Sequence, residues 1–122
     1  MAAPPKPIVL VVEDEALIRM LAVDAFLDAG FEVLEAAHAA EALVVRQGTA
    51  RVHVLFTDVN MPGDMNGIEL AEALRAGAPE LHIFITSALP ILRPVGHIPA
   101  TFFPKPYDAE TVSKAAKARL AA

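Results

Sequence analysis

The stretch of sequence that decides the fold is Val54-Leu55-Phe56-Thr57-Asp58-Val59-Asn60-Met61-Pro62. A short β-branched and aromatic run predicts a buried strand, and the proline that follows cannot continue one. Asp58 is therefore expected at the carboxyl end of a strand, at the mouth of a loop. In an open α/β sheet this edge binds ligands, because the strand ends and helix starts leave polar backbone groups facing a crevice. An aspartate there can serve as a metal ligand, a nucleophile or both.

Strand patterns alternate with helix patterns on both sides of this stretch. Continuous apolar runs predict strands, and apolar residues at helical spacing followed by glycine predict helices. We expect strands at 8–12, 31–35, 52–57, 81–85 and 101–103, and helices at 16–29, 39–47, 68–76 and from a cap at Asp108 to about Leu120. The alternation predicts an α/β fold in which a doubly wound parallel sheet carries helices on both faces.

Composition narrows the class of protein. A chain of 122 residues with 55% hydrophobic residues is expected to form one domain, with a core at about 7–120 and a flexible tail at 1–6. The net charge of −5, without any block of lysine or arginine, indicates no nucleic acid or anionic membrane as partner. No apolar run approaches the ~20 residues of a membrane span. The absence of cysteine fits a reducing cytosol, so a cytoplasmic location is expected.

Polar side chains follow four of the expected strands. Glu13 and Asp14 follow the first strand, Asp58 the third, Ser87 the fourth and Lys105 the fifth. In a parallel sheet these side chains all face one crevice. Three carboxylates packed there repel one another, so the site is expected to hold a cation, and oxygen-only ligands suit Mg²⁺. Lysine suits a phosphoryl group and serine donates a hydrogen bond, so the set fits phosphoryl transfer to Asp58.

Each of these residues also has a simpler interpretation. An aspartate before a proline is often only a turn former, and acidic residues often occupy the first turn of a helix. Lys105 could be a solvated surface lysine. Because Asp14 and Lys105 are expected at the same edge of the sheet as Asp58, we favour a functional site over these simpler interpretations. Thr86 is expected to point away from Ser87 by strand alternation.

At these residues the sequence resembles a response-regulator receiver domain, of the chemotaxis-regulator type. The resemblance covers about 7–120. It rests on Val11-Val12-Glu13-Asp14-Glu15, on Asp58-Val59-Asn60-Met61-Pro62 followed by Asn66-Gly67, on Thr86-Ser87-Ala88 and on Lys105-Pro106. Each motif alone is a weak signal, but four in the right order are highly specific. The segments 56–63 and 103–108 look most like stand-alone receivers that serve HWE-type sensor histidine kinases.

The resemblance implies a flavodoxin-like sheet of five strands in the order 2-1-3-4-5. It also implies that a sensor histidine kinase or a histidine phosphotransfer protein phosphorylates Asp58. Mg²⁺ would be held by Asp14, Asp58 and the backbone carbonyl of Asn60, with Glu13 contributing mainly through water.

The same resemblance gives roles to four further residues. The hydroxyl of Ser87 would move to the phosphoryl group, and the ring of Phe102 would swing inward as a second part of the switch. Lys105 would pair with the phosphate, and the peptide bond before Pro106 would be cis. Two departures from the family pattern are visible. The interval 87–105 is short and rich in proline, which predicts a truncated or irregular fourth helix, and one extra residue lengthens the loop beside Asp58.

The expected function is that of a phosphorylatable signalling receiver. It would relay a phosphoryl group or bind a downstream protein, as a monomer or weak dimer, and would not be an enzyme beyond its own phosphorylation and dephosphorylation. Two alternatives stay open. One is a small Mg²⁺-dependent phosphatase with Asp58 as nucleophile, although Asn60 stands where such enzymes place a second acid. The other is an interaction module that is not phosphorylated.

Overall fold

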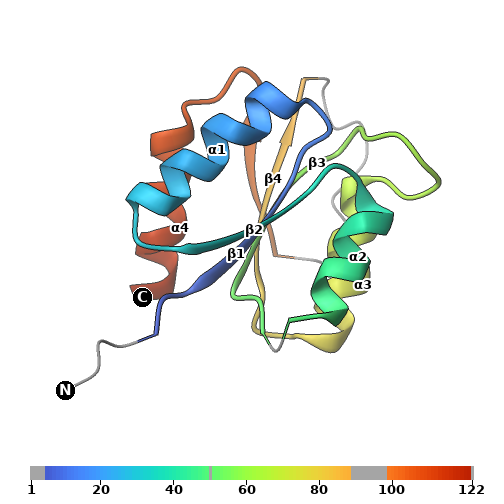
Figure 1. Cartoon of the computed structure of the whole chain (residues 1–122), viewed down its shortest axis with the longest axis horizontal. Helices are drawn as coiled ribbons and strands as arrows, with labels where there is room; N and C mark the ends of the chain where they lie inside the picture. The colour runs from blue at the N-terminus through green and yellow to red at the C-terminus, as the bar shows by residue number, and fades with distance from the viewer. Residues whose placement is uncertain (1–4, 50, 89–98, 122) are drawn as a thin grey trace.

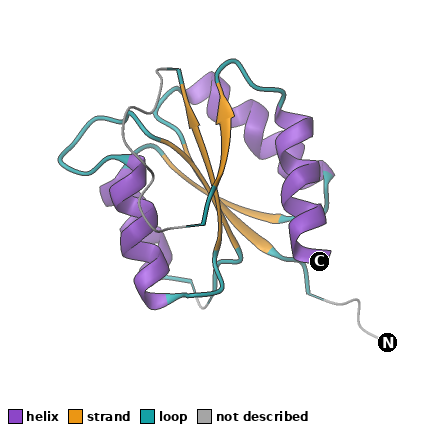
Figure 2. Cartoon of the chain, turned by 180° about the vertical axis from the view of Figure 1, so that it is seen from behind, coloured by secondary structure: helices purple, strands orange, loops and turns teal. Residues whose placement is uncertain are grey.

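The computed structural model describes residues 5–49, 51–88 and 99–121. Its parallel strands form one five-stranded sheet in the order β2-β1-β3-β4-β5. Helices α1 and α4 cover one face and α2 and α3 cover the other (Figures 1 and 2). The elements are β1 (Ile8–Val12), α1 (Ala16–Asp28), β2 (Glu32–Ala36), α2 (Ala39–Gln47), β3 (Val54–Asp58), α3 (Gly67–Gly77), β4 (His82–Ser87), β5 (Thr101–Pro104) and α4 (Ala109–Ala121).

The predicted fold class and strand order are confirmed. Element bounds differ from the prediction by about two residues at most, and the difference that matters is at the ends of β3 and β4. Asp58 still pairs with Thr86, so both strands extend further than their apolar runs. Asp58 and Ser87 are therefore the last residues of strands and are held by the sheet. The predicted irregular fourth helix falls largely on 89–98, and the predicted tail largely on 1–4, both outside the described residues.

Strands β1 and β3 hold the site residues in place because both faces of each strand are buried. Val9 and Val11 of β1 pack on the side of α1 and α4, and Leu10 and Val12 pack on the side of α2 and α3. All four are at most 1% exposed. Each such side chain contributes about 1.5–3 kcal/mol through its burial, so the strand ends rest on a rigid base.

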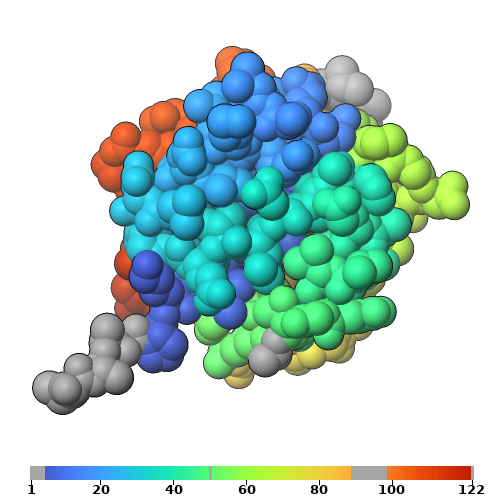
Figure 3. All heavy atoms as spheres, in the orientation of Figure 1, coloured from blue at the N-terminus to red at the C-terminus, as the bar shows by residue number. Residues whose placement is uncertain are grey.

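Helix α1 presents apolar side chains to both the core and the surface. Phe26 is fully buried and packs edge-on against Phe31, with ring centroids 5.2 Å apart. Other large apolar side chains along α1 are largely exposed, at 69% for Leu17 and 58% for Leu21. In Figure 3 this helix lies along the surface of the molecule. The core therefore uses only part of the apolar character of α1.

Helices in the described part of the chain are too short, or not apolar enough, to cross a membrane.

Candidate functional site

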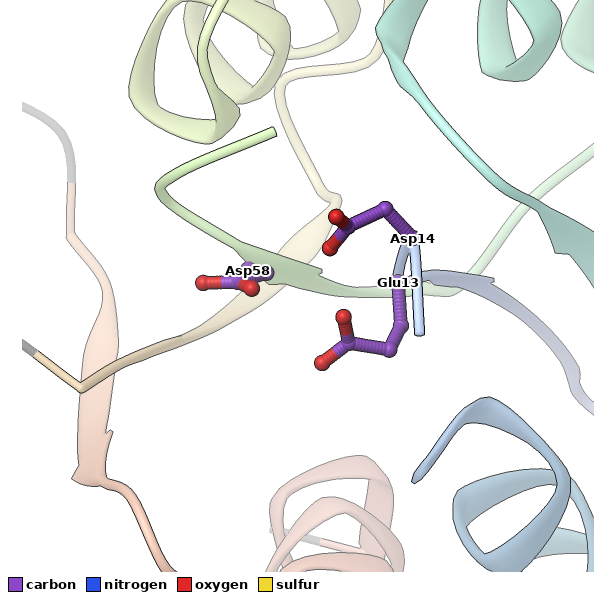
Figure 4. Close-up of side chains that lie close together, drawn as sticks. All are labelled: Glu13, Asp14 and Asp58. Atoms are coloured by element: carbon purple, nitrogen blue, oxygen red, sulfur yellow. The ribbon is translucent and has the colours of Figure 1, made fainter. Parts of the chain in front are cut away.

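Three carboxylates meet at the carboxyl edge of the sheet. β1 and β3 pair in parallel with Val12 opposite Thr57, so the residues that follow, Glu13 and Asp58, are neighbours. Asp14 comes next along the chain, and Figure 4 shows the three acidic side chains together at these strand ends. One oxygen atom from each carboxylate lies within 4.8 Å of the other two. The predicted convergence of these residues is therefore present in the structure.

Lys105 reaches the same cluster from the end of β5. Its Nζ donates hydrogen bonds to Glu13 Oε1 at 2.7 Å and to Asp58 Oδ2 at 2.9 Å. The three side chains are only 13%, 3% and 6% exposed, respectively. Burying charges costs several kcal/mol per ion unless they are paired with good geometry. The ammonium group thus compensates two buried carboxylates that would otherwise be strongly destabilising.

The local electrostatics follow from burial and from this crowding of charges. Burial raises the pKa of the Glu13 carboxyl, Lys105 opposes that rise, and the charge of Asp58 adds to it. For Lys105 burial alone would lower the pKa, but the two carboxylates raise it above its ordinary value. Burial and the charge of Glu13 raise the pKa of Tyr107 to about 12. Lys105 therefore stays charged and Tyr107 stays neutral at physiological pH.

The acidic cluster fits a divalent cation. Mg²⁺ binds oxygen ligands at about 2.0–2.1 Å in octahedral geometry, which brings ligand oxygens within about 4 Å of one another. The three carboxylate oxygens need to approach by only a small distance to meet this geometry. Asp14 is exposed and so leaves the site open to water. The residues present therefore suit a magnesium ion that keeps several water ligands.

Asn60 connects Asp58 to Ser87. Its backbone N–H donates to Asp58 Oδ1 at 3.3 Å, and its side-chain Nδ2 donates to Ser87 Oγ at 3.2 Å. Thr86 alternates with Ser87 along β4 and is buried, and its hydroxyl finds no hydrogen-bond partner within the described ranges. Ser87, and not Thr86, is thus the hydroxyl next to the acidic cluster, as the sequence predicts.

The remaining predicted residues lie on or after β5. The ring of Phe102 is in register with Ile85 and is 42% exposed, so it is turned outward. The Lys105–Pro106 peptide bond is cis, which confirms that prediction.

Two residues that touch the site were missed by sequence reasoning. A Cβ atom at Gly67 would overlap the backbone carbonyl oxygen of Asp58, so α3 begins in direct contact with the strand end. Gly67 stands in the quoted Asn66-Gly67 motif, but the motif alone does not reveal this contact. Arg19 Nη1 donates to the backbone carbonyl of Glu13 at 2.7 Å, and a lone arginine on a helix gives no signal of that role.

Known proteins resemble this chain across most of its length. A family model described as the response regulator receiver domain matches residues 9–93. The sensor kinase CckA of Brucella abortus is 32% identical over 117 residues, which cover 92% of this chain and 12% of that kinase. Chemotaxis protein CheY1 of Helicobacter pylori is 41% identical over 68 residues, or 55% of this chain and 54% of that protein. The chain thus spans about half or less of the length of these two curated relatives.

A solved structure agrees with the sequence comparisons. The crystal structure of the receiver domain from hybrid histidine kinase CckA has a TM-score of 0.78 and 32% sequence identity to this chain, and it covers 93% of this chain and 98% of that one.

Proposed function

The chain belongs to the response regulator receiver domain family of two-component signalling, and on this premise we propose that Asp58 accepts a phosphoryl group from a histidine-bearing partner. The observation that carries the proposal is the 2.9 Å hydrogen bond from Lys105 Nζ to a buried Asp58 oxygen inside an acidic cluster. A turn-forming aspartate has no need of a buried ammonium group. A phosphorylated aspartate needs one, because the group adds about −1.5 to −2 charge.

The transfer uses groups already in place. An Asp58 carboxylate oxygen attacks phosphorus, the P–N bond to the donor imidazole breaks, and the ring leaves with the electron pair and takes up a proton. Glu13, Asp14, Asp58 and the Asn60 carbonyl would hold Mg²⁺, which supplies positive charge to the phosphoryl oxygens. Lys105 supplies the second positive charge from the β5 side.

The proposed conformational switch is driven by the phosphoryl oxygens that are added to Asp58. They are strong acceptors, so they attract the hydroxyl hydrogen of Ser87, whose oxygen accepts from Asn60 Nδ2, and they draw Lys105 away from Glu13. The outward ring of Phe102 then takes the space that opens at the end of β4. In this function the chain relays the phosphoryl group or binds a target protein, and its only catalysis is of its own phosphorylation and dephosphorylation.

Helix α1 is the surface we assign to the phosphodonor. The helix starts two residues after Asp14, and its exposed large apolar residues are Leu17, Met20, Leu21 and Leu27. A pocket of about 440 Å³ between α1 and α4 has Leu21 beside Asp24 and Asp28, while Glu110 on its α4 side is paired with Lys114. This combination suits a helix with an apolar stripe flanked by basic residues, packed so that its histidine faces Asp58.

The test of the docking surface separates docking from chemistry. Leu21→Glu is expected to slow phosphotransfer from histidine kinases or phosphotransfer proteins in a panel by more than about tenfold, since a buried interface charge typically costs more than ~1.4 kcal/mol. Phosphorylation by acetyl phosphate should stay unchanged. Val44→Glu on α2, which is 68% exposed, is the matched control. Equal loss in both variants would contradict the assignment.

The test of the phosphoacceptor is mass spectrometry after incubation with Mg²⁺ and acetyl phosphate. The wild-type chain should gain the mass of one phosphoryl group, and Asp58→Asn should gain none. Asp64→Asn, which alters an exposed loop carboxylate, should behave as wild type. A gain that survives in Asp58→Asn would contradict the proposal, as would the absence of any gain in wild type.

A further inference from the structure

We propose that Arg19 is a positioning residue for the metal site, because it holds the β1–α1 turn in the conformation that presents Glu13 and Asp14 to a divalent ion. The inference rests on the proposed function, since it assumes that the acidic cluster binds Mg²⁺. It assigns a role to a residue that touches neither the ion nor the phosphoryl group.

The turn lacks the usual restraint at the start of a helix. Glu15 occupies the N-cap of α1, and its side chain makes no capping hydrogen bond. By contrast, α3 begins with a full capping box formed by Asn66 and Glu69, and the side chain of His38 caps α2. A side-chain cap contributes about 0.5–2 kcal/mol and fixes the direction in which the chain enters the helix. The turn that carries the acidic residues must obtain this restraint elsewhere.

Arg19 supplies the missing restraint through two directed contacts. Its Nη1 donates to the Glu13 backbone carbonyl at 2.7 Å, and its Nε donates to Glu35 Oε1 at 3.0 Å. The arginine side chain is 21% exposed, so its planar guanidinium is held between α1, the turn and β2. A planar fork of donors loses less freedom per hydrogen bond than a flexible ammonium group does.

The contact with the Glu13 carbonyl controls the direction of Asp14. A peptide unit is planar, so the carbonyl of Glu13 and the N–H of Asp14 turn together. The N–H of Glu13 is held at 3.1 Å by the carbonyl of Ala36 on β2, and Arg19 holds the next peptide plane. Glu13 itself folds back so that its Oε2 accepts from the Glu15 N–H at 3.1 Å. Without Arg19, rotation of this plane would swing the exposed Asp14 carboxylate away from Asp58.

The sign of the effect distinguishes positioning from simple electrostatics. A guanidinium near a cation site repels the cation, so Coulomb's law alone predicts that removal of Arg19 would tighten Mg²⁺ binding. Loss of positioning predicts weaker binding. Outer partners that orient metal ligands commonly account for 10- to 100-fold in affinity.

The experiment measures Mg²⁺ affinity by calorimetric titration of the full chain. Arg19→Ala should raise the dissociation constant about tenfold. Glu35→Gln removes the ion pair but leaves the bond to the Glu13 carbonyl, so it should change affinity by less than about threefold. Arg51→Ala removes an arginine that is 63% exposed and paired with Glu80. Both residues precede strands β3 and β4, at the opposite ends of the strands from the acidic cluster, so this variant should leave the Mg²⁺ affinity unchanged.

Backbone amide NMR spectra of the metal-free protein provide a second measurement. In Arg19→Ala the amide resonances of Asp14 and Glu15 should shift, and those of α3 should stay in place, which separates a loosened turn from global unfolding. Unchanged or tighter Mg²⁺ binding by Arg19→Ala would overturn the inference and leave the proposed function intact. Failure of the wild-type chain to bind Mg²⁺ would instead overturn the proposed function.

Discussion

Replacement of Gly67 by alanine tests how closely α3 must approach the phosphoacceptor. The first residue of α3 lies so near β3 that an added Cβ would overlap the carbonyl oxygen and carbon of Asp58 and would press on Thr57 Oγ1. Two of these atoms belong to the backbone of a central strand, which cannot rotate away as a flexible side chain could. Either α3 or the end of β3 must move, and the bond from the Gly67 N–H to the Val59 carbonyl, now 2.9 Å, would lengthen.

The expected magnitude follows from two opposing terms. Overpacking of this kind costs about 1–3 kcal/mol, and alanine regains up to about 1 kcal/mol over glycine in a helix. With the full gain subtracted, we expect a net loss of up to about 2 kcal/mol, which corresponds to a fall of up to roughly 10 °C in Tm for a domain of this size. The effect on chemistry should be larger, because a displacement of about 1 Å at a reacting group can cost about 100-fold in rate.

Gly77→Ala is the matched control, since it lies at the other end of α3 and has no atom within 4 Å of an added Cβ. Thermal unfolding and the rate of phosphorylation by acetyl phosphate are measured for both variants. Gly77→Ala should be as stable as wild type or more stable, with an unchanged rate. A Gly67→Ala protein that retains both wild-type stability and wild-type rate would refute the argument that close approach at Asp58 is required.

Two further predictions follow from the charged and titratable groups. Lys105→Met should destabilise the protein by about 3 kcal/mol, because removing one partner of a buried ion pair leaves the Glu13 and Asp58 charges uncompensated. Added Mg²⁺ should restore more of the Tm in this variant than in wild type, and an unaltered Tm without Mg²⁺ would contradict the assigned ion pairs. Burial lowers the pKa of His53 below 6.5, and its Nδ1 accepts the Ile8 N–H at 3.0 Å, so the folded state favours the neutral ring. The unfolded chain therefore binds the proton at higher pH, and stability should fall as the pH drops below about 6.5. Urea unfolding at several pH values should show a smaller fall for His53→Asn, and equal slopes would contradict this.

The sequence predicted most of the site because one topological rule maps distant positions onto one edge. Glu13, Asp58 and Lys105 lie far apart in the chain, but each lies at or directly after the end of a strand, and parallel strands place their carboxyl ends together. The apolar runs that define those strands are unambiguous, so the prediction needed no knowledge of packing. The ends of the strands were harder to predict. Thr86 and Ser87 extend β4 because their backbones pair with β3 and β5, and residue type does not reveal this pairing.

Contacts that depend on three-dimensional packing were not predictable. Helical spacing identifies α1, but a helix that is apolar on several sides does not reveal which side the core covers, and Leu17 and Leu21 proved to be exposed. Arg19 occupies an ordinary helical position, and its function depends on where the Glu13 carbonyl points. The direction of a backbone carbonyl cannot be read from residue type, so the sequence gives no signal of this contact.

The two hydrogen bonds of Lys105 explain how the site could accommodate Asp58 both before and after the proposed phosphorylation. In the resting state a single ammonium group is shared by Glu13 and Asp58, and the remaining negative charge makes the cluster attractive to a divalent ion. In the proposed function a bound cation would compensate Glu13 and Asp14, so that Lys105 could leave Glu13 and follow the oxygens added to Asp58. The N–H of Lys105 donates to the Ser87 carbonyl at 3.0 Å, so its backbone is held while its side chain would move. Under the proposed function, the movement of Lys105 would therefore take place on a rigid sheet, and the energy for it would come from exchanging one anionic partner for another.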